Sequence, residues 1–372
     1  MNVRTALKHV ERTARRSLLS ATAALLGTPA RAATPDWGAG EQRVLFLRHD
    51  RIGDMILSTG ILDAIARAQP TITLDVLASP LNAPVLAANP GLGDVLTVDR
   101  KRPWTWPALL LRLRRARYDV VIDCMVTAPS LTTLLLVLAS HARHRVGVAR
   151  RGNDFVYDLP VEPIASAAHI VEHLGALAQA FGVDPTTADV APRIALTADE
   201  HDAAELCWRE IDPSATCTRL LVNVSSGKAA RHWPDDRFVA VLARARERAP
   251  GLRVALIAAP GEAARARTIA RAGGATYAAT SSVRHAFALV AHADRVFTPD
   301  TSIAHAASAF GKPAVVMYLA GKAALWGLYG APGENLESPD QSLASLPVEP
   351  VLHAIDVLVD PTGDPAAHRY AM

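Results

Sequence analysis

Short apolar runs alternate with stretches of helical periodicity along most of the chain. The first apolar run, 44–47, is rich in strand formers, and a tight polar turn at 48–54 follows it. Behind the turn, apolar residues recur at the spacing of one helix face: Ile56, Leu57, Gly60, Ile61, Ala64 and Ile65. The pattern predicts a strand, a loop and a helix, the opening unit of a parallel α/β sheet.

The same rhythm continues through the first half of the chain. Apolar or alternating runs predict further strands at 72–77, 95–98 and 120–123 and a short strand ending at 148. Helical spacing predicts helices at 131–138, 169–181 and 198–210. We interpret residues 212–218 as the boundary between two domains.

The second half repeats the rhythm without repeating the sequence. We expect strands at 220–224, 254–258, 295–297 and 314–318, alternating with helices at 236–248, 262–272, 283–292 and 302–310. The resulting α/β class has two doubly wound domains, 41–212 and 213–347. An extension (1–40) precedes them. A helix and tail (348–372) follow, with a crossing back to the first domain left open.

Composition is that of a globular protein with ample core material. Half of the 372 residues are hydrophobic and a fifth are charged. The three cysteines are odd in number and lack the spacing of a metal site. This indicates a reducing compartment without structural disulfides.

The positive charge is concentrated at the N-terminus. Residues 1–31 contain six basic residues and one acidic residue, a local charge of +5 in a chain of net charge +3. A local anionic partner is therefore expected, and a nucleic-acid-binding domain is not. Three interpretations of 1–40 stay open: a basic amphipathic helix on an anionic membrane surface, a disordered tail, or a signal-like segment.

Two other segments carry suggestive side chains. The basic stretch 100–118 is either a surface helix with long cationic stems or a membrane-facing patch with Trp104 and Trp106 at the interface. His169 and His173 have the spacing of two metal ligands on a helix, but no third ligand is evident. We expect ordinary helix histidines and no metal site.

The first candidate site is the turn at 48–54. Ligands of parallel α/β sheets bind at the carboxyl ends of strands, where this turn lies. Gly53 allows close approach of backbone or substrate, and Asp54 stands at the expected helix start. Asp54 is either an N-cap or a catalytic carboxylate.

The loop 223–236 is the second candidate. Ser225, Ser226 and Gly227 offer hydroxyls and a bare backbone, while Lys228 and Arg231 supply positive charge. Together they suit a diphosphate, although a solvated loop with stray cations is the alternative. The spacing of a Walker loop is absent.

Two further strand-end loops complete the set. In 297–305, Asp300 is expected as N-cap, with the N–H groups of Thr301 and Ser302 free to bind phosphate oxygens. In 258–262, Glu262 can bind a ribose or sugar hydroxyl.

Four motifs carry a resemblance to a known family. Each is weak alone, but their order and spacing are specific: Arg48 with Ile52-Gly53-Asp54; Ser226-Gly227 with Arg231-His232-Trp233-Pro234; Gly261-Glu262; and Asp300-Thr301-Ser302 with His305 and Gly311-Lys312-Pro313. Over about residues 43–345, the chain resembles the family 9 glycosyltransferases, best known for ADP-heptose:lipopolysaccharide heptosyltransferases.

The resemblance implies a GT-B fold, two Rossmann-like domains facing across a cleft, and an inverting transfer that needs no metal or other cofactor. Asp54 matches the general base, and Arg231 stands where the family has a phosphate-contacting lysine. The implied donor-binding residues are Ser226, Gly227, Lys228, Arg231, Glu262, Asp300, Thr301, Ser302 and His305. Arg48, Arg51 and Gly53 are expected to line the acceptor side or the cleft. The family usually has glycine where Ser302 stands.

The chemistry of glycosyl transfer agrees with this assignment. The reaction needs a base for the acceptor hydroxyl and charge stabilisation for the departing diphosphate. No D-x-D sequence occurs, which fits stabilisation by protein groups rather than by a divalent ion. Closing the cleft would bring base and donor together and exclude water.

The expected function is therefore transfer of a sugar, heptose if the resemblance extends to the donor, from ADP-heptose or a similar nucleotide sugar. The acceptor is expected to be a lipid-linked glycan of lipopolysaccharide type, and the protein to be cytoplasmic and peripheral on the inner membrane face. Alternatives are a different sugar or acceptor, or a catalytically silent nucleotide-sugar-binding relative. A nicotinamide dehydrogenase is disfavoured, because neither domain shows G-x-G-x-x-G after its first strand.

Overall fold

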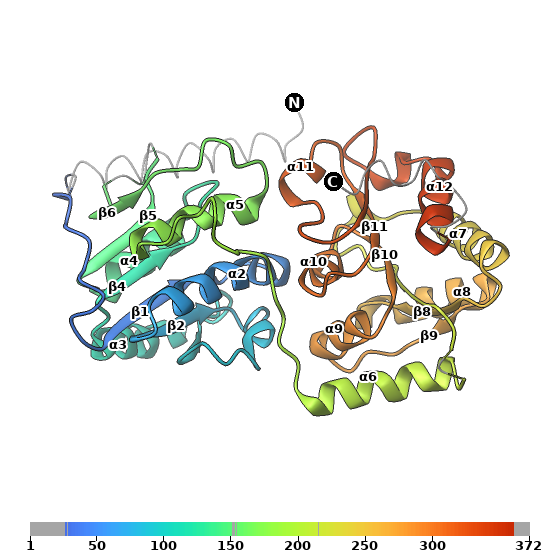
Figure 1. Ribbon diagram of the computed structural model, residues 1–372, viewed down its shortest axis with the longest axis horizontal. Helices are drawn as coiled ribbons and strands as arrows, with labels where there is room; N and C mark the ends of the chain where they lie inside the picture. The colour runs from blue at the N-terminus through green and yellow to red at the C-terminus, as the bar shows by residue number, and fades with distance from the viewer. Residues whose placement is uncertain (1–26, 28, 151–152, 154, 215, 361–372) are drawn as a thin grey trace. The chain divides into compact units, whose positions relative to one another are not determined.

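The chain folds into two compact units, each an α/β domain built on its own parallel sheet (Figure 1). The computed structural model describes residues 27, 29–150, 153, 155–214 and 216–360. Most of the basic N-terminal segment, on which the membrane and signal interpretations rest, lies outside these residues. The first unit runs to Val190, apart from residues 84–88, and the second starts at Ala191.

The first sheet has six parallel strands in the order β3-β2-β1-β4-β5-β6. The strand order reverses direction at β1, which is the signature of a doubly wound sheet. Five of the strands match predicted runs, and β6 was not anticipated. The strands are β1 (Gln42–Leu47), β2 (Ile72–Ala78), β3 (Val95–Thr97), β4 (Val120–Asp123), β5 (His144–Val148) and β6 (Leu159–Val161).

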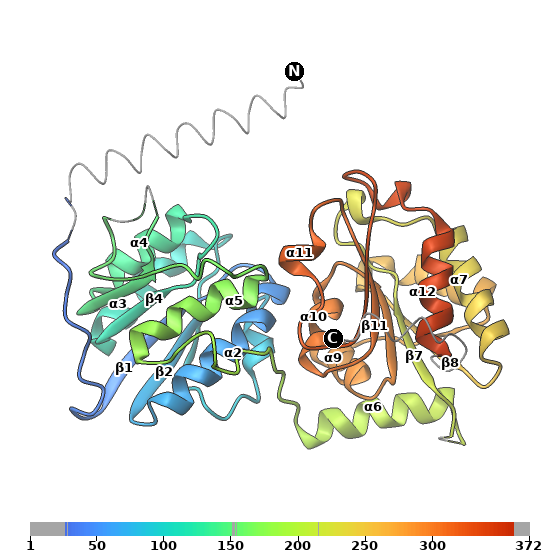
Figure 2. The same cartoon turned by 45° about the horizontal axis from the view of Figure 1, so that its top comes forward.

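Helices cover both faces of this sheet (Figure 2). On one face α3 packs with α4 over a core that includes Leu45, Leu47 and Val121, and on the other α2 packs with α5. The predicted helix 169–181 divides into α5 and a 3₁₀ segment, with His169 as N-cap in a capping box with Glu172. The helices are α2 (Ile52–Ala68), α3 (Trp106–Ala116), α4 (Leu131–Ser140) and α5 (Ile170–Gly175).

The described end of the N-terminal extension packs on the first unit. Trp37 is buried and stacks on Phe181 with ring centroids 4.5 Å apart, and its Nε1 donates to the Ala180 oxygen. The Ala32 amide donates to Asp158. Residues 32–37 therefore belong to the fold rather than to a separate appendage.

The second sheet also has six parallel strands, in the order β12-β11-β10-β7-β8-β9. Its order reverses at β7, so this unit is doubly wound as well. The strands are β7 (Arg219–Asn223), β8 (Arg253–Ile257), β9 (Thr276–Tyr277), β10 (Arg295–Pro299), β11 (Ala314–Tyr318) and β12 (Gly333–Glu337).

The helices of the second unit form two groups, α7 with α8 and α12, and α9 with α6 and α10 (Figure 1). Two placements differ from the expected boundaries. Helix α6, expected in the first domain, packs on α9, with the Trp208 indole donating to Leu289. Helix α12 packs on α7 and stays with this unit, where Val351 and Ile355 are fully buried.

The α-helices of this unit are α6 (Ala198–Ile211), α7 (Asp235–Arg248), α8 (Ala263–Gly273), α9 (Val283–Ala291), α10 (Ser302–Ala309), α11 (Ala323–Trp326) and α12 (Val348–Val359). Short 3₁₀ segments occur at Ala83–Leu86, Pro103–Thr105, Ala176–Phe181, Ala229–Arg231, Pro260–Glu262 and Leu343–Ser345. Across the described part of the chain, no helix has the length and apolar character needed to span a bilayer.

Candidate functional site

The turn after β1 lies at the carboxyl end of the central strand of the first sheet. Helix α2 starts at Ile52, and its N-cap, Arg51, makes no side-chain capping bond. Asp54 therefore lies in the first helical turn, where its charge interacts favourably with the helix dipole, but it is not the N-cap. The capping alternative for Asp54 was wrong.

Arg48 lies buried beneath two carboxylates. Its Nη2 is 3.6 Å from Asp54 Oδ1, its Nε is 3.4 Å from Asp50 Oδ1, and Nε also donates to the main-chain oxygen of Asp54 at 3.1 Å. Its Nη1 donates to the oxygen of Cys124 at 3.1 Å. With 3 % of its surface exposed, Arg48 supports the turn from below and is not the cleft-lining side chain that we expected.

Gly53 is buried as well, whereas Arg51 is exposed. Of the three residues expected to line the acceptor side, only Arg51 presents its side chain to solvent. The turn between β1 and α2 buries Arg48 and exposes Arg51, a difference that the sequence pattern does not reveal.

Burial and neighbouring charges shift the pKa values of Arg48 and Asp50 in opposite directions. Burial lowers the pKa of Arg48, but Cys124, Asp50 and Asp54 outweigh it and leave that pKa above its usual value. Burial raises the pKa of Asp50; Arg48 opposes that rise and Asp54 adds to it. Asp50 was missed as a site residue, although its position four residues before Asp54 in one strand-end turn was the available signal.

In the second unit, the loops after β7, β8 and β10 are joined by hydrogen bonds. Asn223, the last residue of β7, donates from Nδ2 to Thr298 Oγ1 at 2.9 Å and to Thr301 Oγ1 at 3.0 Å. The Ala259 amide, after β8, donates to Ser225 Oγ at 2.5 Å. Three predicted loops therefore converge at the carboxyl edge of this sheet.

The start of α10 is capped by Thr301 and not by Asp300 as expected. Thr301 has extended backbone geometry, and its Oγ1 accepts from the Ile303 amide at 3.3 Å. Asp300 precedes the cap and is buried, with 6 % of its surface exposed. Its carboxylate is engaged elsewhere.

Arg231 holds Asp300 through two contacts. Nη1 donates to the Asp300 main-chain oxygen, and Nη2 pairs with its Oδ2, both at 2.6 Å. Burial raises the pKa of the nearby Tyr318 phenol, and the Asp300 charge adds to that rise. Two residues that the sequence assigned separately to donor binding thus form one ion pair at the helix start.

Arg265 is a second positioning residue that the sequence analysis missed. It donates to the main-chain oxygens of Val224 and Trp233 at 2.8 and 3.1 Å and to Asp235 at 2.7 Å. It also lies 3.6 Å from the Glu262 carboxylate. One guanidinium thereby fixes both ends of the loop after β7 and orients Glu262.

The remaining predicted residues at the carboxyl edge of this sheet differ in how far they are buried. Gly227 has φ = 61°, a left-handed conformation that favours glycine, and it is exposed together with Lys228. Ser226 and His305 are buried, with 7 % and 6 % exposed, and Ser302 is half-buried in the first turn of α10. Trp233, quoted for its motif, belongs to the core, where its ring meets Phe238 edge-on.

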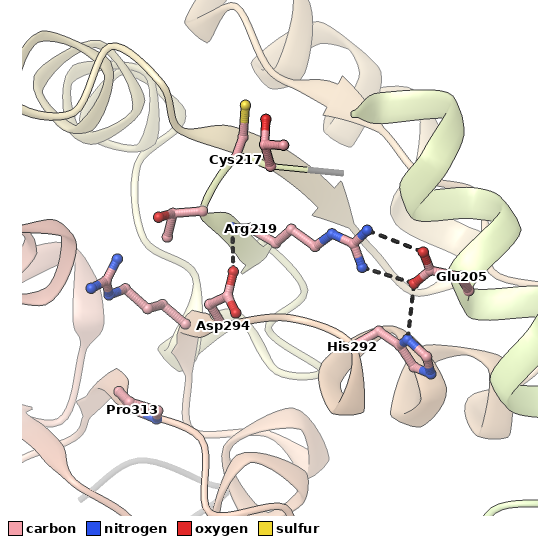
Figure 3. A pocket seen from close by; sticks show the side chains of 9 residues that line it. Glu205, Cys217, Arg219, His292, Asp294 and Pro313 are labelled. Carbon is pink, nitrogen blue, oxygen red and sulfur yellow. Dashed lines mark hydrogen bonds and ion pairs between the residues drawn. The ribbon is translucent and has the colours of Figure 1, made fainter. Parts of the chain in front are cut away.

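A hollow of about 640 Å³ lies on the same unit, at the opposite end of its strands (Figure 3). Arg219 and Arg295, the first residues of β7 and β10, line it. Glu205 accepts from Arg219 at 2.9 Å and lies 3.2 Å from Nδ1 of His292. Since ligands of such sheets bind at the carboxyl ends, the hollow is separate from the candidate site.

The described residues contain no group of three His, Cys, Asp or Glu side chains placed to hold a metal ion. Cys124, Cys207 and Cys217 are all free thiols.

Comparison with known proteins identifies related chains. A family description, "Glycosyltransferase family 9 (heptosyltransferase)", matches residues 106–348. Lipopolysaccharide heptosyltransferase 3 of Escherichia coli K12 is 23% identical over 226 residues. That alignment spans 56% of this chain and 60% of the relative, so part of the relative's length has no counterpart in it.

Solved structures share the fold. A family 9 glycosyltransferase from Veillonella parvula superposes with a TM-score of 0.74 at 18% identity, covering 86% of this chain and 98% of the other. The E. coli heptosyltransferase WaaC, solved with ADP, superposes with a TM-score of 0.67 at 20% identity, covering 85% and 97%. These neighbours confirm the predicted GT-B class with two Rossmann-like domains.

Proposed function

The chain belongs to glycosyltransferase family 9, and from that premise we propose that it transfers heptose from ADP-heptose to a lipid-linked acceptor of lipopolysaccharide type. That it is a glycosyltransferase of the heptosyltransferase family follows from the family match over 106–348. The donor, the acceptor and the mechanism are the proposal. The observation that carries it is the convergence of three strand-end loops on a capped helix start in the second unit.

We assign the donor diphosphate to the start of α10. The amides there point out of a helix whose cap is secured by Thr301, which suits phosphate oxygens. Arg231 adds a fixed positive charge beside them, and Glu262 can accept from a ribose hydroxyl. An E. coli relative in the same fold was solved with ADP, which supports this choice of nucleotide.

We assign the base to Asp54. In the proposed step the acceptor oxygen attacks the anomeric carbon, and its proton passes to the Asp54 carboxylate. The bond to the diphosphate breaks on the opposite face, and ADP leaves with the electron pair, so the configuration inverts. The positive charge of Arg231 and the amides of α10 stabilise the leaving group, in which case no metal is required.

We place the protein in the cytoplasm, peripheral on the inner face of the membrane. The basic N-terminal segment, with its local charge of +5, suits anionic lipid headgroups. A lipid-linked acceptor would be presented at that surface.

The experiment is a transfer assay with the full chain, ADP-heptose and a heptose-free lipopolysaccharide core, in EDTA. Release of ADP together with a product of inverted anomeric configuration is expected. Nucleotide binding without ADP release on any acceptor would instead identify a silent relative. Faster release from another nucleotide sugar would reassign the donor, and abolition by EDTA would refute metal independence.

A further inference from the structure

Helix α3 of the first unit packs against the core of that unit with only one of its sides. Leu113 is fully buried, and Leu109 and Leu110 pack partly buried against the core shared with α4. Trp106, which the membrane-facing interpretation of 100–118 placed at the interface, lies half-buried on this inner side, with its Nε1 donating to the Asp99 oxygen at 3.0 Å. The inner side is therefore complete without a partner.

The outer side carries large apolar groups in solvent. Trp104, in the 3₁₀ turn that leads into the helix, is 72% exposed, more than any other large hydrophobic residue among those described. Leu111 follows seven residues later, a spacing that returns to the same face of a helix, and is 48% exposed. Two exposed apolar groups alone would need no explanation, so their charged surroundings decide what this face can bind.

Cations surround these apolar groups. Seven exposed basic residues lie within 100–117, whereas the neighbouring acids Asp94 and Asp99 are already paired with Arg112 and Arg102, at 2.9 and 3.6 Å. Five of the seven make no ion pair within the described part of the chain: Arg100, Lys101, Arg114, Arg115 and Arg117.

We infer that this face, formed by the turn at Pro103–Thr105 and the outer side of α3, docks on an anionic lipid bilayer. Trp104 and Leu111 enter the interfacial region, where Trp is favoured, and the unpaired cations meet the lipid headgroups. The apolar side chains favour a bilayer over a nucleic acid, because Leu111 gains nothing from a phosphate backbone. The inference deepens the proposed membrane association and places a second contact on the folded first unit, apart from the N-terminal segment.

The experiment is flotation of the full chain with vesicles of phosphatidylcholine, with and without 30 mol% phosphatidylglycerol. Arg114→Gln/Arg115→Gln should weaken binding to anionic vesicles about 30-fold, since each cation near such a surface contributes on the order of 1 kcal/mol. Trp104→Ser should weaken it about 10-fold. Arg271→Gln on α8 and the 63%-exposed Leu206→Ser on α6 are matched controls and should float like the parent.

Equal flotation of the parent, Trp104→Ser and the arginine variant would overturn the inference and leave binding to the N-terminal segment. The inference would also be overturned if the parent bound RNA but no vesicles and if both variants bound RNA more weakly than the parent. The face would then be assigned to a nucleic acid. Transfer to a detergent-solubilised acceptor should be unchanged in all variants. Failure of that assay in the parent would refute the proposed function while the flotation result still stands.

Discussion

Carboxylates in the two units experience opposite balances of burial and charge. In the first unit, burial dominates at Asp50 and raises its pKa even though Arg48 lies 3.4 Å away. In the second unit, hydrogen bonds from Arg284 dominate at Glu200 and lower its pKa to about 2, although burial opposes them. Arg48 is shared between two acids at 3.4 and 3.6 Å, whereas Arg284 donates to both carboxylate oxygens of Glu200.

The difference contrasts the candidate site in the first unit with a contact that stabilises the fold in the second. Glu200 caps α6 through the Thr197 amide at 2.8 Å and ties the helix to α9, so its charge stabilises the fold. Asp50 and Asp54 share one guanidinium, that of Arg48, at 3.4 and 3.6 Å. A carboxylate whose pKa is raised by burial beside a second acid is a common feature of functional sites, which supports the first-unit cluster as a candidate.

The largest expected effect is on turnover. Asp54→Asn keeps the shape of the side chain but removes the base, so transfer should fall by roughly 10²–10⁴-fold. Asp63→Asn, on the same helix, is the matched control and should retain activity. Turnover within a factor of about two of the parent would show that the first-unit cluster has no catalytic base at this position.

The next largest expected effect is on donor affinity and tests Arg231 in the second unit. Arg231→Ala should raise the donor Kd by roughly 10–100-fold, since hydrogen bonds to charged groups contribute about 1.5–3 kcal/mol. Arg231→Lys restores the residue type that the family uses and should recover much of that loss. Titration calorimetry with ADP measures both, and equal affinity in parent and Ala variant contradicts the assignment.

Glu200→Gln tests the stabilising carboxylate. Because the folded pKa is depressed from 4.5 to about 2, the contribution of Glu200 is present above pH 4.5 and is lost as the pH falls toward 2. The variant should lose about 1–2 kcal/mol at pH 7 and show a flatter acid limb in thermal unfolding. Asp199→Asn, one residue earlier in the same helical turn, is the control; a loss as large there would remove the special role of Glu200.

The smallest effect has the opposite sign. The folded pKa of Asp50 lies above its usual 3.8, so the folded state holds the proton longer and stability falls as the pH rises between the two values. Asp50→Asn should therefore raise Tm at pH 7 by roughly 2 °C, with the gain vanishing below pH 3.8. A lower Tm at pH 7 would mean that the Arg48 contact outweighs burial and would erase the contrast with Glu200.

Periodicity was sufficient for most of the fold because buried parallel strands read as short apolar runs. It missed β6, β9 and β12, which have at most five residues and, in β12, four exposed positions. It assigned α6 to the first domain because the position of a polar helix depends on long-range contacts such as the Trp208 indole bond.

Residue type at a strand end marked Asp54, Arg231 and Thr301 as candidates, and the structure places all three just after strands. Their roles in catalysis and donor binding stay predictions. Burial was not predictable: Arg48 was expected at the surface and lies beneath the turn. Arg265 and Asn223 were missed as positioning residues, because several of their partners are main-chain oxygens and hydroxyls that no spacing reveals.

In the proposed function the first unit supplies the base and the second unit binds the nucleotide. This assignment is tested most directly by calorimetric titration of ADP into Asp54→Asn and Arg231→Ala side by side. We expect parental affinity in Asp54→Asn and a loss of affinity of roughly 10–100-fold in Arg231→Ala. Weakened binding in Asp54→Asn with parental binding in Arg231→Ala would contradict it.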